Sequence, residues 1–218
     1  MCFSAVASFV TAAVTGVIGV ASLARVKDAR ELPLAAAPVL FAVQQGVEGL
    51  LWLNLPLAAD ASTATSLTLI FLMFAEVLWP VYAPVAVLLA EPHAQRRRLI
   101  FPCLALGIGV AAYLAWRILT GLHTAHIVDG HIVYETTRGQ SDLVAFAYIS
   151  ATSLPLLISS RPAILGLGVI VFVGGAVAYA AYSEAFVSVW CFFGAAASSV
   201  IIFHFEHARR RRLTPAIA

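Results

Sequence analysis

The chain has 218 residues, of which 61% are hydrophobic and 11% are charged. A soluble domain carries roughly a quarter charged residues, so the composition excludes an ordinary water-soluble globular protein. The formal net charge of +2 says little until the charged residues are placed along the chain. No long linker or low-complexity tail divides the sequence, and we expect a single domain over residues 1–218.

Apolar runs recur along the whole chain. A membrane helix needs about 20 mostly apolar residues, and the segments that fit this length cover residues 3–24, 33–55, 64–90, 99–122, 142–160, 163–182 and 186–205. We therefore expect an all-α membrane protein, a bundle of seven transmembrane helices. The lipid bilayer is its first expected partner.

Basic residues follow every second segment. Eleven of the 13 Lys and Arg residues lie at 25–30, 96–98, 161 and 209–212, on one side of a seven-helix bundle. Cytoplasmic loops collect Lys and Arg, so we expect the N-terminus outside and the C-terminus inside. We interpret these residues as topology signals with some contact to lipid headgroups, and we expect no nucleic-acid partner.

The longest outer loop, residues 120–140, contains a hairpin signal between the fourth and fifth segments. Asp129-Gly130 stands between two β-rich triplets, which is the strongest short-range signal for a β-hairpin. This turn pairs Val128 with His131 and places His126 and His131 on one face. The other face carries the apolar side chains Ile127, Ile132 and Tyr134. We expect the apolar face to cover the helix ends as a lid.

The first three and the last three segments run in the same direction, because a single segment lies between them. Residues 76–82 (EVLWPVY) faintly resemble residues 187–193 (VSVWCFF). A parallel 3+1+3 repeat would explain this similarity, and parallel repeats are one known plan for transporters.

Two glutamates lie deep within the predicted membrane segments. Glu48 is about eight residues, or roughly 12 Å, from the outer end of its segment, and Glu76 about twelve residues, or roughly 18 Å. A charge inside a bilayer costs at least about 2.5–3.5 kcal/mol and usually faces a partner or a cavity. Neighbouring antiparallel helices could bring the two carboxylates together, where both cannot ionise cheaply.

Polar and aromatic residues accompany these glutamates. Gln44, Gln45, Glu48 and Trp52 form one stripe at helical spacing on the second segment, because residues four apart on a helix are neighbours. Trp79, on the third segment, is suited either to the bundle interior or to the outer aromatic belt. We count all five residues among the candidates for binding a ligand or a proton.

Prolines inside the segments free backbone carbonyl groups. Pro80 removes the hydrogen bond that the Glu76 carbonyl would accept, and Pro84 does the same to Pro80, since proline has no N–H. Pro155 likewise frees a carbonyl beside Thr152, which we add to the candidates. Transporter ion sites are built from freed carbonyls and carboxylates at mid-depth.

Cysteines and histidines supply weaker candidates. Cys2 and Cys191 both lie near the outer side, where a disulfide or a shared thiolate metal site would need Cα atoms within about 7 Å. Two buried inert thiols are the alternative. The weak metal candidates are His126, His131, Cys103, His204 and His207, for which solvated loop or interfacial histidines are the alternative.

Other charged residues and glycines have ordinary interpretations. Arg117, Asp142 and Glu184 lie near outer helix ends, where we expect snorkelling or salt bridges at the rim. The glycine-rich stretches 107–109 and 166–168 lie inside apolar segments. We expect them to allow close packing between helices.

Three groups of motifs extend over nearly the whole chain. They are residues 1–5 (MCFSA) with 7–9 (ASF), Gln44-Gln45 with Glu48-Gly49 and Trp52, and residues 188–193 (SVWCFF). They resemble an uncharacterised family of bacterial multi-pass membrane proteins. The resemblance implies a bacterial inner (cytoplasmic) membrane protein and supplies no activity. It also implies motif positions at Cys2, Glu48, Trp52, Trp190 and Cys191.

Better-known seven-helix families fit less well. Microbial rhodopsins need a lysine in the seventh helix for retinal, and Lys27, the only lysine, lies between segments. We therefore expect no retinal and assign no other cofactor. The alkaline ceramidase-like zinc hydrolases use histidines on the second and seventh helices, and the second segment has none.

The leading hypothesis is a membrane transport or sensing protein with a polar site around Glu48 and Glu76, open to the outer side. Its ligand would be a small molecule, an ion or a proton. The alternatives are an intramembrane metal or thiol enzyme, and a structural helix bundle in which the glutamates are protonated hydrogen-bond partners between helices. Of these we favour a protein that is not an enzyme.

Overall fold

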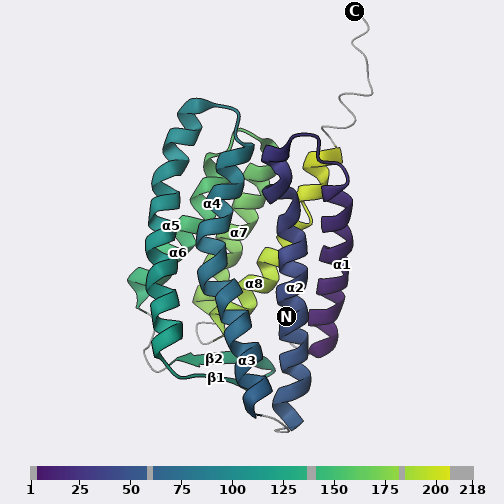
Figure 1. The fold of residues 1–218 in the computed structure, drawn as a ribbon, viewed down its shortest axis with the longest axis vertical. Helices are drawn as coiled ribbons and strands as arrows, with labels where there is room; N and C mark the ends of the chain where they lie inside the picture. The colour runs from purple at the N-terminus through teal and green to yellow at the C-terminus, as the bar shows by residue number, and fades with distance from the viewer. Residues whose placement is uncertain (1–3, 58–60, 137–140, 182–184, 207–218) are drawn as a thin grey trace, which may run out of the picture.

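The structure is a computed structural model that describes residues 4–57, 61–136, 141–181 and 185–206. Apolar helices run along a common axis, and a two-stranded sheet lies across one end of the bundle (Figure 1). The helices are α1 (Ala5–Leu23), α2 (Leu32–Asn54), α3 (Ala61–Leu72), α4 (Trp79–Ala90), α5 (Ala94–Thr120), α6 (Asp142–Ile158), α7 (Pro162–Ala181) and α8 (Phe186–Ser198).

Short elements join these helices. The 3-10 turns η1 (Ala29–Glu31) and η2 (Leu55–Leu57) flank α2, and the π-helical segment η3 (Met73–Leu78) joins α3 to α4. The strands are β1 (His123–Val128) and β2 (His131–Thr136). Helical turns beyond α8 extend the last span to Glu206.

Among the described residues, six helical stretches are long and apolar enough to cross a membrane. They are Ala5–Leu23, Ala29–Asn54, Ala61–Ala90, Ala94–Thr120, Pro162–Ala181 and Phe186–Glu206. The helix α6 is also apolar but has only 17 residues. The expectation of an apolar, helical protein is confirmed, and these six stretches, one fewer than the seven expected, suggest a membrane protein.

Side chains at the helix ends explain where helices begin. The hydroxyl of Ser4 accepts a hydrogen bond from the Ala7 N–H at 3.2 Å, and that of Ser141 accepts one from Val144 at 3.4 Å. Each thereby satisfies a backbone donor that the first helical turn leaves free. Pro33 lies in the first turn of α2, where its missing N–H costs nothing.

The first helix packs along α2 through small side chains. Ser8, Thr15, Gly19 and Ser22 are its buried residues. At Gly19 the approach is so close that an added Cβ would lie 2.7 Å from the backbone nitrogen of Val39. Small residues at such contacts let helix backbones approach in a membrane. Five valines of α1 are exposed instead: Val6, Val10, Val14, Val17 and Val20.

On the other side of the bundle, α5 and α6 lie side by side (Figure 1). Gly107 of α5 faces the carbonyl group of Pro80, and a Cβ at Gly107 would lie 1.9 Å from that oxygen. Gly168 likewise lies against the backbone of Leu156. Gly109 and Gly166 have nothing within 4 Å. In each glycine-rich stretch, therefore, only one of the two glycines serves close packing.

The hairpin has the predicted turn and register. Val128 pairs with His131 and His126 with Val133. Asp129 and Gly130 have φ angles of 48° and 76°, as a two-residue type I′ turn requires.

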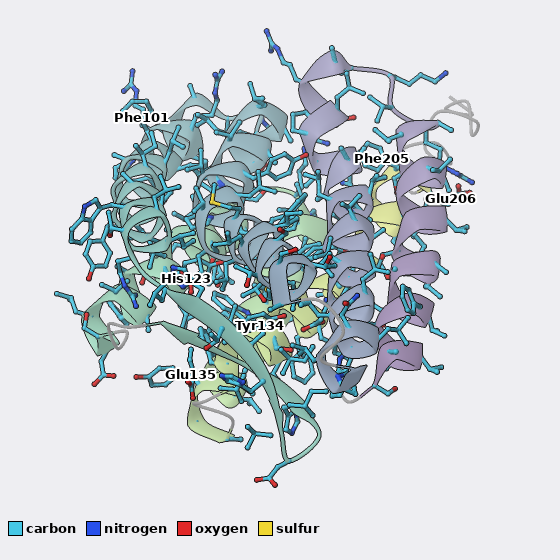
Figure 2. The ribbon with its side chains drawn as sticks, turned by 60° about the horizontal axis from the view of Figure 1, so that its bottom comes forward. Phe101, His123, Tyr134, Glu135, Phe205 and Glu206 are labelled. Atoms are coloured by element: carbon cyan, nitrogen blue, oxygen red, sulfur yellow. The ribbon has the colours of Figure 1, made fainter. Side chains whose placement is uncertain are left out.

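The apolar face of the hairpin lies across the helix ends (Figure 2). Ile132 is fully buried, and the ring of Tyr134 stacks on Phe71 of α3 with centroids 4.6 Å apart. The strands also contact η2 and α8. Ile127, next to the turn, is 38% exposed, so the expected lid covers the bundle with its base and not with its tip.

An ion-pair network closes the opposite end of the bundle. Nη1 of Arg161 lies 2.9 Å from Glu31 and 3.1 Å from the ring of His204. Nε of Arg161 donates to the carbonyl oxygen of Ala90 at 3.0 Å. One side chain thus joins η1, the end of α4 and the end of the last helix.

Glu91, just after α4, is a second fixed point at this end. Its carboxylate accepts hydrogen bonds from the Ser160 N–H at 2.8 Å and hydroxyl at 2.7 Å, and from the His93 N–H at 3.1 Å. Burial raises the pKa of Glu91, but the hydrogen bonds from Ser160 and His93 outweigh it and lower the pKa to about 2.

Candidate functional site

The polar stripe of α2 faces the interior of the bundle. Gln44, Gln45 and Glu48 each have 0% of their surface exposed. This placement was predicted, because a carboxylate facing lipid at this depth is costly. Trp52, on the same stripe, is half-buried beneath the hairpin, and its Nε1 is buried without a hydrogen-bond partner among the described residues.

Glu48 joins α2 to α8. The amide of Gln45 donates to one carboxylate oxygen at 3.2 Å, and the hydroxyl of Ser188 donates to the other at 2.5 Å. One helical turn away, the indole N–H of Trp79 donates to the side-chain oxygen of Gln44 at 2.7 Å. The stripe is thus tied to both α8 and α4.

Glu76 lies in the π-helical segment η3 and is 6% exposed. Pro80 disturbs the backbone hydrogen bonds here, because it lacks the N–H that would reach back four residues. Such single π-helical turns are frequent at functional sites. The hydroxyl of Tyr148 donates to the carbonyl oxygen of Ala75, the residue before Glu76, whereas the carbonyl expected to be free was that of Glu76 itself. Thr152, one turn further along α6, donates to the carbonyl of Tyr148 at 2.9 Å.

Arg117 is the charged partner on α5. It was expected to snorkel at the rim, but it is only 5% exposed and lies within electrostatic range of Glu76. The spacing of Arg117 along the helix could have predicted that it is buried. Arg117 continues the spacing of the buried face of α5, which is formed by Cys103, Gly107, Val110 and Leu114.

A cavity of about 90 Å³ lies in the middle of the bundle, between α2, α4, α6, α7 and α8. Trp79, Tyr148, Thr152, Trp190 and Cys191 line it, and its wall is almost entirely apolar. A smaller cavity of about 10 Å³ is lined by Glu76, Tyr148 and Cys191. That volume is roughly what one water molecule needs.

Cys191 connects the two cavities with the two glutamates. Cys191 lines both cavities, and its side chain lies within electrostatic range of Glu48 and of Glu76. Of the predicted candidates, Trp79 and Thr152 line the central cavity and Glu76 lines the smaller one, while Glu48 and Gln44 line neither. Sequence reasoning missed Ser188, Tyr148 and Arg117.

A model of the family of unknown function DUF6629 matches residues 1–217. The chain belongs to DUF6629. The expectation of an uncharacterised family that extends over nearly the whole chain is confirmed. No curated protein and no solved structure matches this DUF6629 chain.

The weaker candidates of this DUF6629 chain do not gather in the same way. Among the described residues, no three His, Cys, Asp or Glu side chains come together as a metal site would require. His126 faces Glu135 at 3.6 Å, and His204 faces Glu31 at 3.7 Å. The thiol of Cys103 donates within its own helix, and His131 lies on the hairpin. Cys2, Glu184 and His207 lie outside the described residues. The predicted distance between Cys2 and Cys191 therefore stays a prediction.

Proposed function

We propose that this chain is a membrane transport or sensing protein that binds a small molecule, an ion or a proton between Glu48 and Glu76. The observation that carries the proposal is the position of the two acids. They lie on different helices, both buried, and both within electrostatic range of Cys191, which lines the central cavity.

The main alternative is that the two acids only hold helices together. Gln45 and Ser188 donate to different oxygens of Glu48, and a neutral glutamine in its place could still accept one of these two hydrogen bonds. A glutamine in place of Glu48 would avoid the cost of at least about 2.5 kcal/mol that an ionised residue carries at this depth. Two buried acids within electrostatic range of one residue, Cys191, therefore favour a role in which charge or protons matter.

We also propose that the shorter helix α6 is a seventh span, with the N-terminus outside, in a bacterial inner membrane. The network of Arg161 and the pair of Arg25 with Glu206 (3.3 Å) lie at the end away from the hairpin. Cytoplasmic ends collect such residues. A C-terminal reporter should then report the cytoplasm; an external location would mean one span fewer or more.

A parallel repeat would extend this proposal. Trp79 and Trp190, which correspond in the two similar segments, line the same central cavity, and Glu76 and Val187 line the same smaller one. Positions related by a parallel repeat face each other across an axis along the membrane normal. This arrangement supports the repeat without requiring further sequence similarity.

The test compares Glu48→Gln and Glu76→Gln with the wild type in liposomes that contain a pH-sensitive dye. A potassium gradient with valinomycin drives protons across the membrane. We expect wild-type protein to move protons faster than protein-free liposomes, and each variant to lose this movement while keeping its helical content. Glu135→Gln is the matched control, because Glu135 lies on the exposed side of the hairpin.

A site that binds protons without transporting them is tested by a second measurement, infrared difference spectra after a pH jump. The wild type would then show carboxylic acid signals that disappear in Glu48→Gln or Glu76→Gln, although the wild type moves no protons in the liposome assay. If both variants match the wild type in proton movement and in these spectra, the acids are structural hydrogen-bond partners and the proposal is wrong.

A further inference from the structure

Aromatic rings surround the central cavity. Five of them come from four different helices: Phe41 from α2, Trp79 and Tyr82 from α4, Tyr148 from α6 and Trp190 from α8. Apolar cavities exclude water and can hold apolar ligands, and the faces of aromatic rings in addition attract cations.

The polar atoms of these rings are all used inside the protein. Each N–H or O–H group donates to a helix and not into the cavity. The four bonds are Trp79 to the Gln44 side chain (2.7 Å), Tyr82 to the Pro33 carbonyl (2.6 Å), Tyr148 to the Ala75 carbonyl and Trp190 to the Val171 carbonyl (3.2 Å). A ligand in the cavity therefore meets ring carbon and finds few hydrogen-bond donors.

Two pairs of these rings cross at steep angles, while Phe41 stacks on one face of Trp79 with centroids 3.8 Å apart and 16° between the planes. Trp79 and Tyr82 cross at 84° with centroids 5.8 Å apart, and Tyr148 and Trp190 cross at 70° and 5.0 Å. Each pair forms a corner in the wall of the same cavity, one on α4 and the other between α6 and α8. Rings arranged in this way form the aromatic cages that hold quaternary ammonium groups through cation–π attraction.

The charges near the cavity distinguish a cation from a neutral ligand. Glu76 lines the smaller cavity together with Cys191 and lies near Arg117, whereas Glu48 lines neither cavity and acts on the site through Cys191. The group thus has two acidic side chains and one basic side chain, and a bound cation favours ionisation of the acid that would otherwise stay protonated. The excess negative charge favours a cation and opposes an anion.

We propose that the central cavity binds a small organic ammonium ion, with its alkyl groups against Trp79, Tyr148 and Trp190 and its charge balanced by Glu48 and Glu76. This inference rests on the proposed function and names the ligand class of that site. The cavity of about 90 Å³ exceeds the roughly 10–15 Å³ that one water needs and suits a compact group such as tetramethylammonium.

The experiment uses the purified full chain in lipid nanodiscs. Tetramethylammonium and choline are titrated against it at constant ionic strength, with 3,3-dimethylbutan-1-ol as the neutral counterpart of choline. Binding is followed by tryptophan fluorescence and by the midpoint of thermal unfolding. We expect both ammonium ions to bind and to raise the midpoint, and the neutral alcohol to bind at least about tenfold more weakly, because it lacks the cation–π term.

Variants separate the rings from their polar atoms. Tyr148→Phe keeps the ring and should keep the affinity, whereas Tyr148→Leu should weaken binding about two- to thirtyfold, the range for one lost cation–π contact. Trp116→Phe is the control for the fluorescence signal, since Trp116 is 49% exposed on the outer surface of α5. Glu48→Gln should weaken the binding of both ammonium ions without changing that of the alcohol.

The outcomes separate this inference from the proposed function. Equal binding of choline and the alcohol would show a site for neutral apolar ligands and would overturn the inference. If neither ammonium ion binds, the inference is also wrong. Proton movement in the liposome assay that depends on Glu48 and Glu76 would still support the proposed function. Ammonium binding that is unchanged in Glu48→Gln and Glu76→Gln would refute the role given to the two carboxylates.

Discussion

The contact between α5 and the carbonyl group of Pro80 makes Gly107→Ala a severe perturbation. A Cβ at Gly107 would lie 1.9 Å from that oxygen, whereas a carbon–oxygen contact needs roughly 3.3 Å, so the two helices must separate by about 1.4 Å. The obstacle is backbone, which cannot rotate away as a side chain can. Overpacking costs about 1–3 kcal/mol, and we expect a loss at the upper end of that range.

The matched control is Gly109→Ala, two residues along the same helix. Nothing lies within 4 Å of a Cβ at Gly109, and alanine forms helices better than glycine by about 1 kcal/mol. Thermal unfolding in one detergent, followed by circular dichroism, compares the two. A loss of about 3 kcal/mol corresponds to a midpoint lower by on the order of 6–12 °C for a domain of this size. Gly109→Ala should melt at or above the wild-type temperature. If the two variants melt together, the close approach of α5 to Pro80 is wrong.

Three further changes test other parts of the molecule. Glu91→Gln should lower the unfolding midpoint at neutral pH. The difference from wild type should vanish as the pH falls from about 4.5 toward about 2, because a group with a lowered pKa contributes stability only while it is ionised. Unfolding midpoints measured across that pH range test this prediction, and a difference that stays constant would contradict it. Ser188→Ala should cost about 1–3 kcal/mol in chemical unfolding, since it removes a donor to the buried carboxylate of Glu48; Ser66→Ala, on an exposed surface, should cost nothing measurable. Gly130→Val should strain the turn by about 1–2 kcal/mol, because φ is 76° there, and should speed proteolysis within the hairpin; unchanged cleavage would count against the turn.

The features that follow from local sequence were predictable. The Asp129-Gly130 turn fixed the register of the hairpin, because its two positive φ angles allow only one arrangement of neighbouring strands. Hydropathy located the helices, since bilayer thickness demands long apolar runs. The burial of Glu48 followed from the cost of facing a carboxylate toward lipid.

Features that depend on how helices rotate about their axes were not predictable in the same way. In a membrane both lipid and the protein interior are apolar, so hydropathy does not tell which glycine faces a neighbour: Gly107 does and Gly109 does not. For the same reason the central cavity has no linear signal, because its wall collects residues from five helices. Arg117 was misjudged because its nearness to the helix end suggested the rim, while its spacing pointed inward.

The packing of α1 on α2 has a consequence for biogenesis. The two helices are consecutive, and the small residues Ser8, Thr15, Gly19 and Ser22 lie buried along the first of them, so that at Gly19 its backbone comes close to Val39. They can pair as soon as both have left the ribosome, before the later helices emerge from it. The exposed valines of α1 then meet lipid at once, and the pair can enter the membrane as one helical hairpin onto which the later helices assemble.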